Sequence, residues 1–187
     1  GTGTRIASVD GLILIDGAGQ GTGNQNRGVQ VVQGALIETT DTGNITIEGR
    51  GSAAGADLND GVRLSGAGTI VRTTGAGDIE IDGEAGGTGD FNVGVRVLSG
   101  AVVEATGGGA VTVEGVGGGG AGEDDGENDG IRLSDTGTRV STTSGALQLE
   151  GEGGGAGGSA NNVGVRIFDG ALVSSTSGPI TVDGTGG

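Results

Sequence analysis

The sequence predicts an all-β protein that folds as a right-handed parallel β-helix, a solenoid with three strands and about 34 residues in each coil. Three observations predict this fold. Strand patterns bounded by glycine recur at nearly constant spacing, aliphatic and polar residues alternate within them, and equivalent positions match from one repeat to the next. The right-handed sense follows from the general rule for crossovers between parallel strands.

The clearest repeat is Gly-x-aliphatic-x-aliphatic-acid-Gly, which occurs six times at intervals of 32 to 36 residues. Its copies are residues 11–17, 43–49, 77–83, 109–115, 145–151 and 178–184. Alternation with a period of two and enrichment in β-branched residues are typical of a strand with one buried face. Each copy is therefore expected to form one strand of a coil.

Two further patterns complete the predicted coil. One is Asn-x-Gly-aliphatic-x-aliphatic, and the other is an alternating stretch at residues 35–40, 69–74, 101–106, 138–143 and 171–176. Five aliphatic residues per repeat are too few to close a core alone, so stacking of coils must bury them. If the coils stack in register, Ile37 lies above Val71, and Val62 lies above Val95.

Asparagine opens the second pattern in every repeat. Asn tolerates left-handed backbone, and its side-chain amide can bond to the equivalent residue of the next coil. The glycine two residues later suits the same sharp corner. We therefore predict a structural ladder along this corner, formed by Asn26, Asn59, Asn92, Asn128 and Asn162.

Residues 1–187 are interpreted as one solenoid segment of five to six coils, with coil boundaries near residues 34, 68, 100, 137 and 170. The residue after the Asn is Arg27, Val93 or Val163 in alternate coils, and Asp60 or Asp129 in the coils between. This alternation predicts a two-coil super-repeat of about 68 residues. The segment is interpreted as an excerpt of a longer chain, so we expect further repeats or end-to-end self-association to cover its open strand edges.

Composition excludes several kinds of site. Glycine accounts for 49 of the 187 residues, a share that would indicate disorder if it followed no period. The absence of His and Cys rules out the usual zinc sites, disulfides and His-activated nucleophiles. A formal net charge of −15 argues against nucleic-acid binding, and no apolar run is long enough for a membrane span. We therefore predict no enzyme, no catalytic residue and no cofactor.

Two columns of charged residues are candidates for chemistry. Arg63, Arg96, Arg132 and Arg166 recur on the outward face of one strand, with Gln30 in the first coil. A polysaccharide lyase could use such an Arg as a base, but a catalytic site is a singular constellation. We therefore expect a solvated structural ladder. The second column consists of acids, which we expect to cap the strand or form ion pairs, with bound calcium as the alternative: Asp16, Glu48, Asp82, Glu114, Glu150 and Asp183.

The densest acidic loop is a weak calcium candidate. It contains Glu123, Asp124, Asp125, Glu127 and Asp129, but it lacks the spacing of an EF-hand. Calcium therefore stays open, and no other metal is expected.

The combination of Gly-x-Ile-Thr-Ile-x-Gly, a Gly-rich loop, Asn-x-Gly-Val-x-Val and a Gly-Ala-x-Val-x-Ser-Thr stretch resembles the repeats of giant bacterial surface adhesins of the filamentous-haemagglutinin-like kind. The resemblance implies secretion, a place at the bacterial cell surface and a structural role in an adhesin or extracellular filament. The alternative is a domain that binds polysaccharide or, as a weaker option, cleaves it, with cell-surface or matrix glycans as partners.

Overall fold

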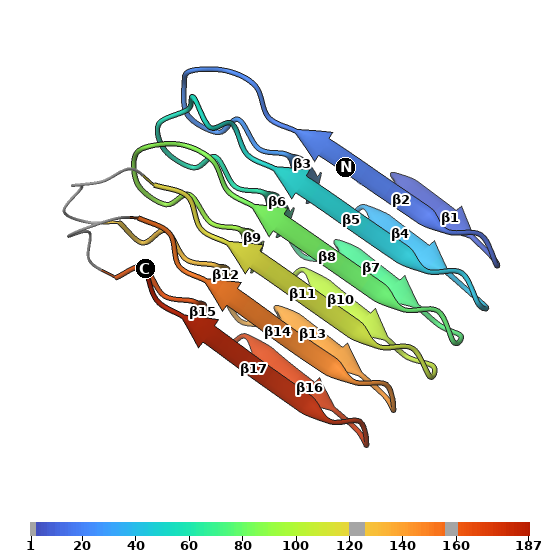
Figure 1. Ribbon diagram of the computed structural model, residues 1–187. Helices are drawn as coiled ribbons and strands as arrows, with labels where there is room; N and C mark the ends of the chain where they lie inside the picture. Colours follow the sequence, from blue (N-terminus) through green and yellow to red (C-terminus); the bar gives the residue numbers. More distant parts are fainter. Residues whose placement is uncertain (1–2, 120–125, 156–160) are drawn as a thin grey trace.

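The turns of the solenoid follow one another about 33 residues apart, and about five of them are stacked in the computed structural model (Figure 1). The structure describes residues 3–119, 126–155 and 161–187. Within these ranges the chain forms strands and no helix. The prediction of an all-β solenoid with three strands per coil is confirmed.

Each coil contributes one strand to each of three parallel sheets. Sheet A contains β1 (Arg5–Ser8), β4 (Leu36–Thr39), β7 (Ile70–Thr73), β10 (Val102–Ala105), β13 (Arg139–Thr142) and β16 (Leu172–Ser175). Sheet B contains β2 (Ile13–Ala18), β5 (Ile45–Arg50), β8 (Ile79–Glu84), β11 (Val111–Val116), β14 (Leu147–Glu152) and β17 (Ile180–Thr185). Sheet C contains β3 (Val29–Val32), β6 (Val62–Ser65), β9 (Val95–Leu98), β12 (Ile131–Leu133) and β15 (Val165–Ile167).

Strand register matches the sequence pattern column by column. In sheet A, Ile37 pairs with Val71, and Val71 pairs with Val103. In sheet C, Val62 pairs with Val95. The predicted stacking of equivalent positions is therefore confirmed, and each strand bonds to the equivalent strand one coil away.

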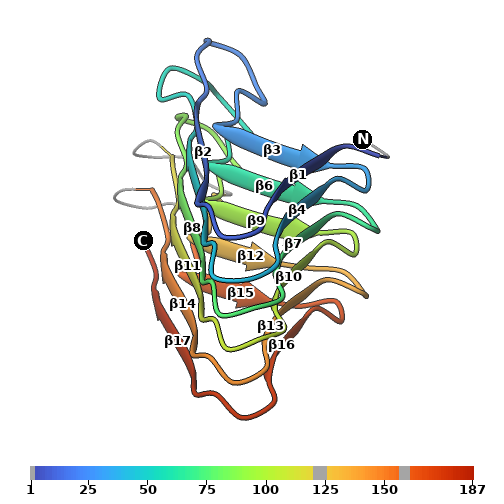
Figure 2. The same ribbon diagram turned by 90° about the vertical axis from the view of Figure 1, so that its right-hand side faces the viewer.

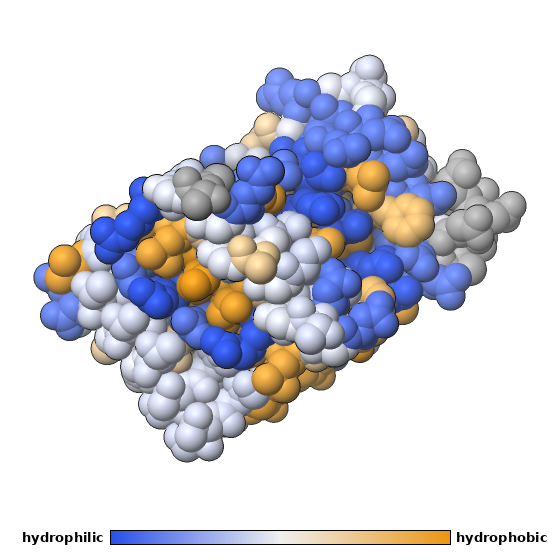
Figure 3. Space-filling model, turned by 180° about the vertical axis from the view of Figure 1, so that it is seen from behind, coloured by the Kyte–Doolittle hydropathy of each residue, from blue (hydrophilic) through white to orange (hydrophobic). Residues whose placement is uncertain are grey.

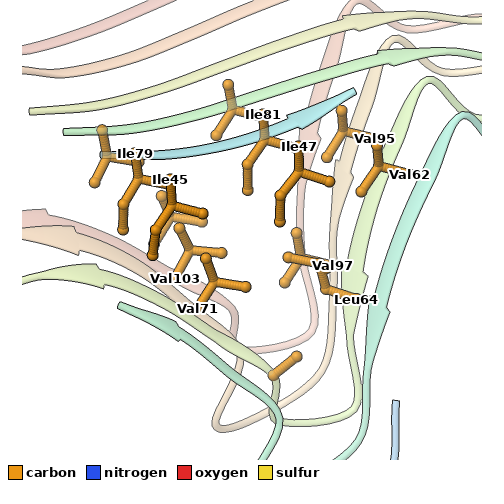
Figure 4. Packing of buried hydrophobic residues seen from close by; sticks show 14 of the residues in the cluster. Ile45, Ile47, Val62, Leu64, Val71, Ile79, Ile81, Val95, Val97 and Val103 are labelled. Atoms are coloured by element: carbon orange, nitrogen blue, oxygen red, sulfur yellow. The ribbon is translucent and has the colours of Figure 1, made fainter. Parts of the chain in front are cut away.

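The three sheets surround a narrow interior that their aliphatic side chains fill (Figures 2 and 4). Ile45 and Ile47 of β5 are fully buried, and so are Val62 and Leu64 of β6. Thr39 completes the inner face of β4 and is also fully buried. Because each strand places only every second residue inside, one coil supplies one layer of this core, and its neighbours supply the rest.

The turn from sheet C to the next strand of sheet A contains a glycine with left-handed backbone in every coil, with φ between 75° and 89°. Left-handed backbone is unfavourable for residues that carry a Cβ, which explains the choice of glycine here. These glycines stand where the sequence divides the chain into coils: Gly34, Gly68, Gly100, Gly137 and Gly170. In the described part of the chain, the connections from β2 to β3, from β5 to β6 and from β8 to β9 leave the solenoid at one edge (Figure 1).

Candidate functional site: the polar corner of sheet C

The predicted asparagine ladder runs along the corner where the chain enters sheet C. The backbone N–H of Asn59 donates to Oδ1 of Asn92 at 2.8 Å, and the N–H of Asn92 donates to Oδ1 of Asn128 at 2.8 Å. The same bond joins Asn26 to Asn59 at 2.9 Å, and Asn128 to Asn162 at 3.0 Å. Each side-chain oxygen therefore satisfies a backbone donor of the preceding coil.

The expectation that these asparagines have left-handed backbone is wrong. The left-handed residue is the one before the Asn, as at Leu58 and Phe91, which both have φ of 59°. The Asn itself is not left-handed. Its N–H points along the solenoid axis to the next side chain, and the preceding residue makes the sharp bend.

The glycine two residues after the Asn also has a different role from the one expected. Gly94 does not have left-handed backbone, but a Cβ there would lie 2.7 Å from the carbonyl oxygen of Gly83, at the end of β8. Gly130 faces Gly115 of β11 in the same way, also at 2.7 Å. Glycine is required because the backbones of sheets B and C touch at this corner.

The arginine column lies on the outer face of sheet C, and its members are in register. Arg63 pairs with Arg96, and Arg96 with Arg132, which in turn pairs with Arg166. The expectation of a solvated ladder is wrong, because their side chains are only 9% to 23% exposed. Stacked guanidinium groups repel one another, so their burial requires carboxylates close by.

Asp60 supplies one such carboxylate and is completely buried. Its Oδ1 lies 3.0 Å from Arg96 of the following coil. Its Oδ2 lies 3.2 Å from Arg27 of the preceding coil and 3.7 Å from Arg63 of its own coil. Oδ1 also accepts the N–H of Val93 at 3.3 Å. A single carboxylate thus ties three consecutive coils together.

Asp129 repeats the arrangement two coils later and is also completely buried. Its Oδ2 lies 3.1 Å from Arg166 and 3.4 Å from Arg132, and its Oδ1 accepts the N–H of Val163 at 3.1 Å. Glu127 adds a second carboxylate, 2.7 Å from Arg132. The guanidinium of Arg132 also lies 5.1 Å from the ring centre of Phe168.

Burial and the neighbouring opposite charges shift the pKa values of these buried groups in opposite directions. Burial raises the pKa of Asp60 and of Asp129 although arginines surround both of them. Burial lowers the pKa of Arg96 for the same reason, because water no longer solvates the charged form. Glu127 is closer to solvent, and its hydrogen bond from Arg132 lowers the pKa of its carboxyl.

The paired aspartates give a physical reason for the two-coil super-repeat. Asp60 and Asp129 occupy alternate coils, and each reaches the arginine of the following coil. The coil between them therefore needs no acid, and Val93 fills the position with its side chain fully buried. The sequence shows this alternation, but it does not show that the carboxylates face the arginine column.

The arginines also fix the left-handed corners. Arg96 donates to the carbonyl oxygen of Phe91 at 2.5 Å, and Arg166 donates to that of Asn161 at 2.6 Å. In both cases the acceptor is the left-handed residue five positions earlier in the chain. Sequence reasoning missed this link, although the constant spacing from the residue before the Asn to the Arg was visible.

The predicted column of acids lies on the outer face of sheet B and is in register along the sheet. At one end, Arg50 lies 3.8 Å from both Asp16 and Glu84. At the other end, Glu114, Glu150 and Asp183 line a groove of about 290 Å³ together with Glu152. Partial burial and the neighbouring carboxylates raise the pKa of Glu114.

Nothing in the described ranges confirms a calcium site. Glu127 and Asp129 direct their carboxylates to Arg132 and Arg166, while Glu123, Asp124 and Asp125 lie outside the described residues. Among the residues that the structure describes, no group of three or more acidic side chains is arranged to hold a metal ion. The question of calcium binding therefore stays open.

The polar corner offsets part of the positive charge in the wall of the solenoid, because the carboxylates of Asp60, Glu127 and Asp129 lie against the guanidinium groups of the column. The described part of the chain contains no helix that could span a membrane. Comparison with protein-family models, with curated proteins and with solved structures found no match to this chain. The absence of enzymatic activity stays a prediction.

Proposed function

We propose that the chain is a structural repeat module of a secreted adhesin or surface fibre, in which stacked coils form a rigid rod. The observation that carries the proposal is the direction of its polar contacts. The asparagine ladder and the Asp60 and Asp129 clusters all run along the solenoid axis and join one coil to the next. A site for chemistry would break the repeat, whereas these contacts recur with it.

Rigidity follows from where these contacts lie. The ladder and the Asp60 cluster are buried, so bending the rod would separate buried donors from their acceptors at that corner.

Hydrophilic and hydrophobic residues interleave across the back of the molecule (Figure 3). The placement outside the cell rests on the resemblance of the repeat to bacterial surface adhesins.

Lengthening the solenoid by whole repeats tests the proposal. Residues 50–115 form a unit that starts and ends at equivalent points, because Gly49, Gly83 and Gly115 are in register. Inserting one, two or three extra copies after Gly115 adds two coils each time and keeps the Asp60 and Val93 types in alternation. Small-angle scattering should show a rod that lengthens by about 10 Å per unit at constant cross-section.

A matched control inserts the same units with the order of residues 50–115 scrambled. This control keeps the composition but removes the register, so it should increase flexibility without lengthening a rod. If the in-register series instead grew in radius with no change of axial ratio, the rod proposal would be contradicted.

A second candidate function is polysaccharide binding, and the groove on sheet B is the observation that favours it. Its carboxylates, from Glu114, Glu150, Glu152 and Asp183, could accept hydrogen bonds from sugar hydroxyls. A glycan array should detect binding to the intact chain if this function holds, and Glu150→Gln should reduce the signal. No signal from any glycan would leave only the structural role.

A further inference from the structure

The Asp129 cluster of the polar corner is balanced in charge. Arg132 and Arg166 supply two guanidinium groups, and Asp129 and Glu127 supply two carboxylates. Glu127 contacts the arginines of two successive coils, with Oε2 at 2.7 Å from Arg132 and Oε1 at 3.6 Å from Arg166. The cluster therefore shows how this corner can hold an anion against two neighbouring arginines of the column.

The Asp60 cluster has the same plan but an excess of positive charge. Among the described residues, Asp60 supplies the only carboxylate that pairs with Arg27, Arg63 or Arg96. Three guanidinium groups and one carboxylate leave two positive charges in this part of the wall. Charge that is buried without compensation is unfavourable, so the cluster favours the approach of a further anion.

Two differences in sequence cause this imbalance. Leu58 and Glu127 are equivalent, because each is the left-handed residue before the Asn and lies five positions before the Arg, with φ of 59° and 45°. Leu58 supplies no charge at this position. In the preceding coil, Arg27 stands where the other cluster has Val93. The first difference removes a negative charge from the Asp60 cluster, and the second adds a positive one.

The arginines of the Asp60 cluster have donors that the described residues do not use. Nη1 of Arg63 lies 3.7 Å from Oδ2 of Asp60, which is too long for a good hydrogen bond. The side chain of Arg96 is only 9% exposed, and its Nε has no hydrogen-bond partner among the described residues. Burial lowers the pKa of Arg63, and the charge of Arg27 lowers it further.

The cluster can be reached from solvent at the outer face of sheet C. The side chain of Arg63 is 21% exposed, and Leu58 is partly exposed, whereas Asp60 is completely buried. An ion from solution can therefore approach Arg63 on the side from which Glu127 approaches its arginine in the other cluster. This approach leaves the apolar core closed.

We propose that the Asp60 cluster binds an oxyanion, a sulfate or carboxylate group that contacts Arg63 and Arg96 from the side of Leu58. The carboxylate of Glu127 is the template for this contact. Guanidinium groups bind oxyanions through paired N–H donors, and partial burial strengthens such contacts. The site goes beyond the structural role, because it gives the wall of the rod a ligand.

The test follows the Nε–H signals of the column arginines by NMR while sodium sulfate replaces sodium chloride at constant ionic strength. Saturable shifts are expected at Arg63 and Arg96. Arg132 and Arg166 belong to the balanced cluster and should not shift, so they are a control within the same chain. These signals report contact at named residues, whereas a melting temperature would also rise through the general effect of sulfate.

Leu58→Glu is the decisive variant, because it places a carboxylate at the position that Glu127 holds in the other cluster. Glu127 shows that this left-handed backbone accepts Glu. The affinity for sulfate should fall at least about tenfold, because the new carboxylate occupies the same donors. Leu58→Gln is the matched control, since it has nearly the same size without the charge and should keep the affinity within about threefold.

A second titration distinguishes a free ion from an anionic group on a polysaccharide. Its probes are sodium acetate and a tetrasaccharide of uronic acid, and both carry the carboxylate group. Tighter binding of the tetrasaccharide than of acetate at Arg63 and Arg96 would support the site and assign it to a polysaccharide. Binding of the tetrasaccharide no tighter than that of acetate would support the site and assign it to a free ion.

Absence of saturable shifts at Arg63 and Arg96 with every one of these probes would overturn the proposal, and so would equal shifts at all four column arginines. Equal loss of affinity in Leu58→Glu and Leu58→Gln would also overturn it, because the loss would then not come from the charge. The comparison of the two clusters in the unsubstituted chain keeps the test decisive even if a substitution at Leu58 disturbs folding.

Discussion

Asp60 is the residue on which three coils converge. Its buried carboxylate contacts Arg27, Arg63 and Arg96, so three guanidinium groups share one negative charge. A buried ion pair adds little when it is complete, but removing one partner leaves buried charge without compensation. The cost of losing Asp60 should therefore be large, although the residue takes no part in the apolar core.

Asp60→Asn should lower the free energy of unfolding by about 3 kcal/mol, because the amide cannot neutralise the three arginines. Denaturation with urea measures the change. Asp82→Asn is the control, since Asp82 is exposed on the outer face of sheet B and its replacement should change stability by less than about 0.5 kcal/mol. Equal effects of the two substitutions would contradict the role given to Asp60.

Glu38 provides a test by pH on sheet A. Its carboxylate is buried between Arg5, at 2.9 Å, and Arg72, at 2.6 Å. Hydrogen bonds from these two arginines hold its pKa below the ordinary value of 4.5. A carboxyl whose pKa is lower in the folded state stabilises the fold above its unfolded pKa, and this contribution is lost as the pH falls through the folded pKa.

Glu38→Gln should therefore destabilise the chain at pH 6, and the difference from the unsubstituted chain should shrink as the pH falls below about 4.5. Thermal unfolding across this range measures the difference. If the difference in melting temperature between the substituted and unsubstituted chains stayed constant down to the lowest pH, the ion pairs would not be its cause.

The asparagine ladder belongs to the scale of the strand and its corner. Asn92 accepts the N–H of Asn59 through Oδ1, and its Nδ2 donates to the carbonyl oxygens of Gly89 at 2.8 Å and Ala56 at 3.0 Å. One side chain thus satisfies a corner in its own coil and a donor in the preceding coil. Loss of the side chain would leave several buried groups unpaired.

Asn92→Ala should reduce stability by about 2 to 3 kcal/mol and should raise the hydrogen-exchange rate of the Asn59 amide most strongly. Amide exchange followed by NMR resolves this residue. Asn92→Asp is the matched variant, because it keeps an acceptor for Asn59 and should preserve more of the protection at that amide. Uniform loss of protection across all coils in both variants would speak against a local ladder.

The sequence predicts features that show as a pattern along the chain, but not contacts between side chains of different coils. Strand positions and register follow from residues such as Ile45 and Val62, because alternation and repetition are visible along the chain. The burial of the arginine column does not follow from this pattern, because it depends on Asp60 of one coil facing Arg96 of the next. The left-handed bend at Leu58 and Phe91 was also missed, because neither residue type favours that backbone.

At the scale of the whole molecule, the stack has no internal limit to its length, because each strand pairs with the equivalent strand of the next coil. Such a solenoid gains stability from neighbouring coils rather than from one closed core. The solenoid is therefore expected to lengthen by whole two-coil units, each of which contains one such aspartate.

The most direct test of this account is electron cryomicroscopy of the chain with three extra copies of residues 50–115. Continuous stacking should give a straight rod with an axial spacing of about 4.8 Å between coils and a cross-section that does not change along its length. A string of separate globular bodies, or a rod whose spacing changes at each inserted unit, would contradict continuous stacking of the coils.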